Sequence, residues 1–195
     1  SRKSIFITGA ASGIGRAVAE HFASRGWFCG LFDIDAVGLQ ETLAKIGTNN
    51  GMSGLLDVRA RDQWAEAVAS FGSATGGTCD LLFNNAGMFG PQTTIDEIAL
   101  DDWRAVLDVN LTGMFLCARA AFRQMRHQTP QGGRIINNGS ISAHTPREGS
   151  ICYTTTKHGV SGLTKTLTLD GRAFDIACGQ IDIGNARTEL VQGLE

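Results

Sequence analysis

The chain has 195 residues, of which 43% are hydrophobic and 18% charged, with a formal net charge of −2 and a pI near 6.1. This balance is ordinary for a soluble globular protein and indicates neither a nucleic-acid-binding nor a membrane-binding surface. No apolar run reaches the roughly 18 residues that span a bilayer, and the first residues lack the apolar stretch of a signal peptide. We therefore expect a cytoplasmic protein without nucleic-acid or membrane partners.

Strand and helix patterns alternate along the whole chain. The strand candidates are short and apolar: Ser4–Thr8, Phe28–Asp33, Gly54–Asp57, Asp80–Asn84, Arg134–Asn138 and Asp175–Ile181. The helix candidates lie between them: Gly13–Arg25, Ala36–Ile46, Ala60–Phe71, Asp101–Arg126 and Ser150–Leu169. Most of these strands do not alternate apolar and polar residues, which is typical of strands buried on both faces. The order predicts one α/β domain over residues 1–195, a doubly wound parallel sheet with helices on both faces.

A glycine-rich turn follows the first predicted strand, in the sequence Thr8-Gly9-Ala10-Ala11-Ser12-Gly13-Ile14-Gly15. Glycine permits a tight turn, and at a helix entrance it lets backbone N–H groups approach a pyrophosphate, which the partial positive charge of the helix N-terminus also favours. A plain strand-to-helix turn would use the same residues. The preceding strand, the following helix and an acid after the second strand favour a dinucleotide site of the Rossmann type.

That acid is Asp33, eighteen residues beyond Gly15. A carboxylate there can accept hydrogen bonds from the adenosine ribose hydroxyls, and it would repel a 2′-phosphate. Ser12 and Ile34 offer no positive charge to neutralise such a phosphate, so NAD is favoured over NADP. Two alternatives stay open: Asp33 merely ends the strand, or Asp35 takes the ribose role.

A second motif, Tyr153-Thr154-Thr155-Thr156-Lys157, lies thirteen residues after Ser140 and contains the only tyrosine of the chain. Residues four apart share one helix face. A free tyrosine has a pKa of about 10, but a nearby ammonium, or the positive ring of an oxidised nicotinamide, stabilises the phenolate. Tyr153 could then act as general base for alcohol oxidation and general acid for ketone reduction, with the Ser140 hydroxyl holding the substrate oxygen. The two motifs together predict hydride transfer between a nicotinamide and an alcohol or ketone.

With these residues in place, the chain resembles the short-chain dehydrogenase/reductase family, and the spacing G-x-x-x-G-x-G resembles its shorter-chain branch. Further family motifs follow in order from about Lys3 to Glu189: Asp57-Val58, Asn84-Asn85-Ala86-Gly87, Asn110, and then Ser140, Tyr153 and Lys157. The resemblance implies that Lys157 also binds the nicotinamide ribose and that Asn110 holds a water linking Lys157 to solvent. Taken alone, Asn110 could equally be a helix-kink residue, and Asn85 could brace neighbouring strands.

The expected catalytic residues are Asn110, Ser140, Tyr153 and Lys157. The expected cofactor contacts are Gly9, Ser12, Gly13, Ile14, Gly15, Asp33, Asp57, Val58, Asn85, Ala86, Gly87, Tyr153, Lys157 and Thr188. No metal is expected, because the four histidines and five cysteines show no ligand spacing, and the odd, scattered cysteines argue against a disulfide framework.

The chain departs from the family pattern after the sixth predicted strand. Ile183 stands where the family usually has proline, although Gly184 is kept and Thr188 matches the threonine that contacts the nicotinamide carboxamide. Family members also continue through a substrate-covering segment, a last helix and a seventh strand, which we expect this chain to lack.

The predicted activity is NAD-dependent oxidation of a secondary alcohol or reduction of a ketone. We expect a homodimer or homotetramer, and the family resemblance implies pairing through the helices at 101–126 and 150–169. Met88 and Phe89 could form an apolar wall of the substrate site, His144 could touch substrate or lie at the surface, and Arg147 could pair with an anionic substrate. A catalytically silent dinucleotide-binding sensor or scaffold is the alternative. The glycine spacing disfavours a sugar-nucleotide epimerase or dehydratase.

Overall fold

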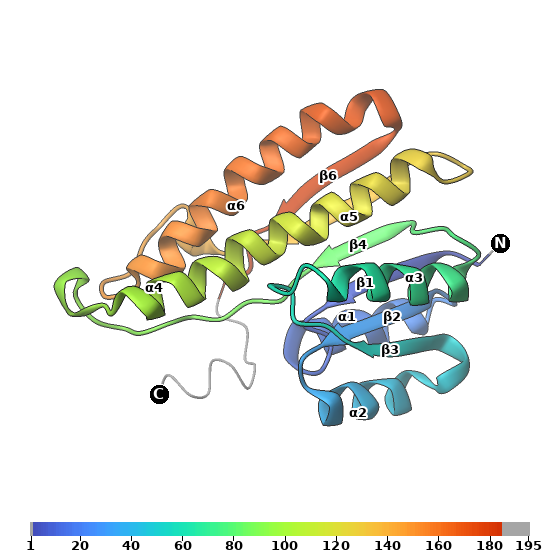
Figure 1. Ribbon diagram of the computed structural model, residues 1–195, viewed down its shortest axis with the longest axis horizontal. Helices are drawn as coiled ribbons and strands as arrows, with labels where there is room; N and C mark the ends of the chain where they lie inside the picture. Colours follow the sequence, from blue (N-terminus) through green and yellow to red (C-terminus); the bar gives the residue numbers. More distant parts are fainter. Residues whose placement is uncertain (1, 185–195) are drawn as a thin grey trace.

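The computed structural model describes residues 2–184, which form a six-stranded parallel sheet with helices on both faces (Figure 1), as the sequence predicts. The strand order is β3-β2-β1-β4-β5-β6. The strands are β1 (Ser4–Thr8), β2 (Phe28–Asp33), β3 (Gly51–Leu55), β4 (Leu81–Asn84), β5 (Gly133–Asn138) and β6 (Ile176–Ile181). The helices are α1 (Gly13–Ala23), α2 (Ala36–Ile46), α3 (Gln63–Thr75), α4 (Leu100–Leu107), α5 (Met114–His127) and α6 (Ile151–Asp170).

Two apolar cores hold the layers together, one on each face of the sheet. On one face, α1 and α2 pack through Ala19 and Leu39 against Ile5, Ile7 and Leu31, all of which are buried. On the other face, α3 and α5 pack against the sheet around Phe6, Phe32, Trp64, Phe71, Cys117, Met125 and Ile135. The alternation of strand side chains between the two faces places Ile5 and Phe6 in different cores.

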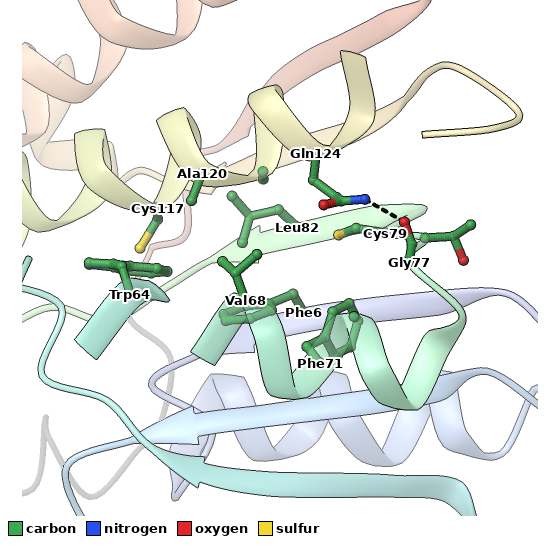
Figure 2. Close-up of a pocket in the computed structure, with 13 residues that line it drawn as sticks. Phe6, Trp64, Val68, Phe71, Gly77, Cys79, Leu82, Cys117, Ala120 and Gln124 are labelled. Carbon is green, nitrogen blue, oxygen red and sulfur yellow. Dashed lines mark hydrogen bonds between the residues drawn. The ribbon is translucent and has the colours of Figure 1, made fainter. Parts of the chain in front are cut away.

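A small apolar cavity of about 20 Å³ lies within the second core, between α3 and α5 (Figure 2). Phe6, Trp64, Val68 and Leu82 are among the side chains around it, and Gln124 of α5 donates a hydrogen bond to the Gly77 carbonyl beside it. Its lining offers little hydrogen-bonding chemistry, so this cavity is a packing gap between two helices.

The third strand and the third helix differ most from the limits expected from the sequence. The third strand occupies Gly51–Leu55, not 54–57, because it pairs residue by residue with Cys29–Asp33 of β2 and takes its register from that strand. The third helix begins at Gln63 and ends before Gly76. Both segments contain small and polar residues, so the hydrophobic pattern does not show where the strand and the helix begin and end.

The expected single helix at 101–126 is divided in the structure. A π-helical segment, Asp108–Gly113, separates α4 from α5 and has Asn110 at its centre. The run 100–127 is also the one described helix long and apolar enough to cross a membrane by length and composition. In the fold, α5 is a core helix, because Cys117, Ala121 and Met125 are buried against the sheet.

Strand β6 is not buried on both faces, contrary to the expectation for most strands. Ile176 is buried on the α6 side, where Gln180 also bonds with α6, whereas Ile181 on the other side is 46% exposed. A Cβ atom added at Gly179 on that second side would meet no heavy atom within 4 Å. Within residues 2–184, therefore, α6 covers one face of this edge strand and no helix covers the other.

Candidate active site

A cleft of about 280 Å³ opens at the carboxyl edge of the sheet, where the strand order reverses between β1 and β4. Crevices at this position are the usual ligand sites of doubly wound sheets. Most of the residues singled out in the sequence line it, although they come from distant segments. The lining is Gly9, Ser12, Gly13, Ile14, Asp33, Asn85, Ala86, Gly87, Met88, Phe89, Asn138, Gly139, Ser140, Tyr153, Lys157, Ile183 and Gly184.

The glycine-rich turn forms the floor of the cleft below the N-terminus of α1. Gly15 does not line the cleft, and a Cβ atom there would collide with the carbonyl oxygen of Gly9, so its role is close packing of the helix on the turn. Ser12 occupies the N-cap position with extended backbone, but its side chain makes no capping hydrogen bond. Its hydroxyl and the first amides of α1 are thus available to a phosphate group.

Asp33 lies at the end of β2 and braces this same turn. One carboxylate oxygen accepts a hydrogen bond from the backbone N–H of Ala11 at 3.0 Å, and the other accepts from Ile34 N–H at 2.7 Å. Asp35 is instead the N-cap of α2 and accepts from Val37 and Gly38. The structure therefore places Asp33, not Asp35, in the cleft.

Tyr153 and Lys157 stand on one face of α6, as their spacing predicts, and both line the cleft with Ser140. The Lys157 ammonium lies 5.3 Å from the centre of the Tyr153 ring and donates a hydrogen bond of 2.8 Å to the Asn138 carbonyl. Burial lowers the pKa of Lys157 to about 8, an effect that the negative charge of Asp182 partly opposes. The ring of Phe89 covers Tyr153 with a centroid separation of 4.8 Å.

The pKa of Tyr153 moves in the direction opposite to the expectation from the sequence. Burial raises it, and the lowering effects of a hydrogen bond with Ser140 and of the positive charge of Arg147 are smaller. In the protein alone, Lys157 therefore does not lower the pKa of the Tyr153 phenol into the neutral range. The physical reason is desolvation, which disfavours the phenolate more than the neighbouring groups favour it.

A chain of amides joins the glycine-rich turn to Lys157. The side-chain N–H₂ of Asn85 donates to the carbonyls of Thr8 and Gly9 at 3.0 and 3.2 Å, and its oxygen accepts from Asn138 at 2.7 Å. The bond from Lys157 to the Asn138 carbonyl continues the chain. The buried side-chain oxygen of Asn138 accepts no hydrogen bond from residues 2–184. Asn85 therefore braces strand ends as well as lining the cleft.

Asn110 is fully buried behind the cleft in the π-helical segment. Its side-chain oxygen accepts from Met88 N–H, and its amide donates to the Met88 carbonyl, both at 2.8 Å, and to the Thr156 hydroxyl at 3.2 Å. The side chain thus clamps the segment after β4 to α6, one residue before Lys157. π-helical segments are rare and frequent at functional sites.

Besides Gly15, two predicted cofactor contacts within the described residues, Asp57 and Val58, do not line the cleft. Asp57 pairs with Arg59 at 2.6 Å, and hydrogen bonds from that guanidinium lower the pKa of Asp57 despite partial burial. Val58 is buried in the core, and its carbonyl accepts a hydrogen bond from Trp64. Thr188 lies outside the described residues. Contacts from these three to a cofactor stay predictions.

The structure adds a group of polar side chains that the sequence reasoning did not assign. Asp182 follows β6 and accepts hydrogen bonds from the Ser140 backbone N–H at 3.0 Å and from Gln180 at 2.6 Å. Its second oxygen lies 2.7 Å from Nε2 of His144. Within residues 2–184 no group of three or more His, Cys, Asp or Glu side chains is arranged to hold a metal ion.

Comparison with known proteins identifies the family. The family model of the short chain dehydrogenases matches residues 3–195. Glucose 1-dehydrogenase 2 of Bacillus subtilis (strain 168) is 32% identical over 189 residues, covering 96% of this chain and 73% of that protein.

Solved structures agree with this assignment. The 3-ketoacyl-(acyl-carrier-protein) reductase from Brucella melitensis, complexed with NADH, superposes with a TM-score of 0.93 at 26% identity, covering 97% of this chain and 78% of that one. NAD⁺-bound xylitol dehydrogenase gives 0.89 at 30% identity, covering 93% and 70%. This chain belongs to the short-chain dehydrogenase/reductase family of oxidoreductases.

Proposed function

We propose that the protein is an NAD-dependent oxidoreductase that interconverts a secondary alcohol and a ketone, with Tyr153 as general acid and base. The observation that carries the proposal is the convergence of Ser140, Tyr153 and Lys157 with the glycine-rich turn and Asp33 on one cleft. These groups come from three different strand ends, those of β1, β2 and β5, and from one helix, and a cofactor-binding sensor would need only the turn and Asp33.

The cleft suits a dinucleotide in several respects. The N-terminus of α1 and the unbonded Ser12 hydroxyl offer donors for the pyrophosphate, and Asp33 offers acceptors for ribose hydroxyls. When bound, the nicotinamide supplies hydride chemistry that no protein side chain can supply. The protein's own contribution is to orient the reacting groups and to move a proton.

The proposed proton path runs through Tyr153. In alcohol oxidation the phenolate oxygen takes the substrate hydroxyl proton, and in ketone reduction the phenol returns it to the carbonyl oxygen. Because burial raises the pKa of Tyr153, catalysis needs additional positive charge near the phenol, which Lys157 and an oxidised nicotinamide ring would provide together. Ser140 holds the substrate oxygen by its hydroxyl, and Lys157 holds the nicotinamide ribose.

Asn110 enters this scheme through the backbone. Its side-chain donors are engaged by Met88 and Thr156, so we propose that a water linking Lys157 to solvent would bind to the backbone of the π-helical segment and not to this side chain. We propose that Asn110 keeps that segment and Lys157 in register.

Preference for NAD rests on the charge around the adenosine ribose. Asp33 places a carboxylate in the cleft, and Arg16 of α1 is already bonded to the Ala11 carbonyl and to Glu41, at 2.9 Å from the latter. A 2′-phosphate would meet a negative group without a free guanidinium from this helix. The NADH and NAD⁺ complexes named above support the same choice.

The substrate end of the cleft has an apolar wall formed by Met88 and Phe89. The ring of Phe89 lies tilted against the ring of Tyr153, which places an aromatic side chain beside the proposed acid and base. We infer a small-molecule alcohol or ketone with an apolar face beside its functional group.

A second copy of the chain is the proposed partner. A broad groove runs over α3, α5 and α6, and its apolar lining includes Phe115, Leu116, Phe122, Leu163 and Leu167. Phe115 is 48% exposed in the isolated chain. Pairing of α5 and α6 across a two-fold axis would cover this surface, and light scattering of Phe115→Asp beside the unaltered protein tests it: loss of a dimer is expected.

The activity is tested by following NADH formation from NAD over a panel of secondary alcohols, with nucleotide sugars included. Tyr153→Phe keeps the ring that packs on Phe89 but removes the hydroxyl, so kcat should fall by about 10²–10⁴-fold while NADH affinity changes little. Thr154→Val removes a hydroxyl from the same helical turn outside the cleft and serves as the control. Full turnover in Tyr153→Phe would refute the general-base role, and NADH binding without any turnover in the unaltered protein would favour the sensor.

A further inference from the structure

A carboxylate, that of Asp182, lies against the backbone of Gly139 beside Ser140. Asp182 reaches over Gly139 to the backbone N–H of Ser140. A Cβ atom at residue 139 would collide with the near oxygen of Asp182 and lie 2.7 Å from Nε2 of Gln180. The backbone of Gly139 is not in the left-handed region, so close approach is the reason for glycine here.

The carboxylate is fixed from three directions. Ser140 N–H and Gln180 Nε2 both donate to one oxygen, and His144 lies against the other at 2.7 Å. Gln180 is itself held by Ser161 and Thr164 of α6. Burial alone would raise the pKa of Asp182, but the hydrogen bonds from His144, Gln180 and Ser140 outweigh it and lower that pKa. The group is therefore a carboxylate at neutral pH.

We infer that Asp182, seated on Gly139 and supported by His144, is a positioning residue that fixes Ser140 for the substrate oxygen and supports the charge of Lys157. The inference rests on the proposed function for the roles of Ser140 and Lys157. Asp182 itself touches neither substrate nor cofactor in this assignment. It acts on Ser140 through a backbone hydrogen bond and on Lys157 through its negative charge.

Different variants separate the hydrogen bond to the Ser140 backbone from the charge effect on Lys157. Asp182→Ala removes the acceptor and the charge, whereas Asp182→Asn keeps an oxygen for Ser140 N–H, removes the charge and turns an amide N–H₂ towards His144. Gly139→Ala keeps the charge but pushes the carboxylate away from Ser140. Asp101→Asn, which breaks an exposed pair with Arg104 on α4, is the control for loss of one carboxylate.

The positioning role predicts a split between kcat and binding. Asp182→Ala and Gly139→Ala should each lower kcat by about 10–100-fold, because small misplacement of a reacting group has effects of this size, while the Kd for NADH at pH 7 changes little. Asp182→Asn and Asp101→Asn should keep kcat within about threefold of the unaltered protein. Unchanged kcat in both Asp182→Ala and Gly139→Ala would overturn the positioning role.

The negative charge of Asp182 predicts a pH effect on NADH affinity that a simple loss of structure would not cause. The titratable groups around Lys157 are Tyr153 from its own helix and Asp182 from the end of β6, with His144 against Asp182 and Arg147 acting on Tyr153. Without the negative charge the Lys157 ammonium loses its proton more readily. The alkaline loss of NADH affinity should therefore begin about half to one pH unit lower in Asp182→Asn than in the unaltered protein, and an identical profile would refute this role.

Hydrogen exchange gives a reading that needs no turnover. In the cofactor-free protein the Ser140 amide should be protected, and Asp182→Ala and Gly139→Ala should speed its exchange by about tenfold or more, while Asp182→Asn preserves protection. Equal protection in all variants overturns the inference. If the unaltered protein binds NADH but turns over no alcohol, the chemistry of the proposed function fails, and exchange and binding still decide whether Asp182 holds Ser140.

Discussion

The two ends of the sheet are stabilised by different means. Around β1, β2 and β3 the interior is apolar, with Phe6 and Phe32 stacked at 4.1 Å and helices on both faces. From β4 onward many polar side chains are buried beside the apolar ones, among them Asn84, Asn110, Asn137, Asn138, Ser140, Thr156, Lys157 and Thr164. Before β4, the buried polar residues are only Ser4, Thr8 and Thr42 within the described chain.

The difference follows from what each end supplies to the cleft. The first half of the chain, before β4, contributes backbone amides and one carboxylate to the cleft. Apolar contacts, which have no preferred direction, can therefore pack this half. The second half of the chain, from β4 onward, must hold a hydroxyl, a phenol and an ammonium in fixed geometry. Hydrogen bonds can do this because they are directional. Substitutions in the first half should therefore act mainly on stability, and those in the second half on stability and turnover together.

The largest stability effect is expected at Phe71 of α3. Its ring is buried, packs edge-on against Phe6 at 5.2 Å and lies far from the cleft lining. Phe71→Ala should lower the free energy of unfolding by about 3–5 kcal/mol, because it removes a large buried side chain, and should leave kcat of the folded enzyme unchanged. Urea unfolding beside steady-state kinetics measures both. If kcat falls by more than the fraction of folded protein, the expectation that substitutions before β4 act mainly on stability is wrong.

Cofactor choice should change with two residues at the end of β2. Asp33→Ser together with Ile34→Arg exchanges a negative group for a positive one at the proposed site of the adenosine ribose. The ratio of kcat/KM for NAD over NADP should fall by about 100-fold, or about 3 kcal/mol. Because Asp33 also accepts from Ala11 N–H, Asp33→Asn is the matched variant that keeps an oxygen there. An unchanged ratio would remove Asp33 from the ribose role.

The buried Lys157 should make stability depend on pH. Its pKa is about 8 in the folded protein against 10.5 for the free side chain, so folding carries the full cost of a buried ammonium below pH 8. Between pH 8 and 10.5 the unfolded state binds more protons than the folded state, and stability rises with pH. Relative to Lys157→Met, the unaltered protein should gain about 1–3 kcal/mol across that interval.

This gain is measured by urea unfolding of both proteins at pH 7.5 and pH 10. The difference between the two proteins isolates Lys157, since tyrosine and the cysteines titrate in both. A pH-independent difference would show that the ammonium is not desolvated in solution.

The smallest effect on stability is expected at Asn137 of β5, one of the buried polar residues that follow β4. Asn137 accepts from Asn84 and donates to Thr164, but both partners keep other hydrogen bonds. Asn137→Leu should therefore cost only about 1–2 kcal/mol of unfolding free energy, with a parallel fall in kcat because α6 shifts against β5. Asn49→Leu, at the surface turn before β3, controls for the change in side-chain chemistry. Unaltered kcat at reduced stability would mean that the network supports folding alone.

Local signals sufficed for much of the sheet and for the two motifs. The bounds of β1, β2 and α2 were predicted correctly, because apolar runs end at glycine or at acidic capping residues there. The third strand was misplaced because Gly51, Ser53 and Gly54 carry no hydrophobic pattern, and pairing with β2 sets its register. The sequence left Asn110 open as a helix-kink residue but did not predict the π-helical segment, in which Asn110 bonds with Met88, 22 residues away in the chain.

The sequence by itself determined the order of elements, the dinucleotide turn and the shared face of Tyr153 and Lys157, because each depends on residues close together in the chain. Only the tertiary structure decided the direction in which the pKa of Tyr153 moves, the position of Asp33 in the cleft with Asp35 capping α2, and the contact of Asp182 with Ser140. Burial and long-range hydrogen bonds are properties of packing, and no local pattern encodes which distant side chain will fill the space that Gly139 leaves open.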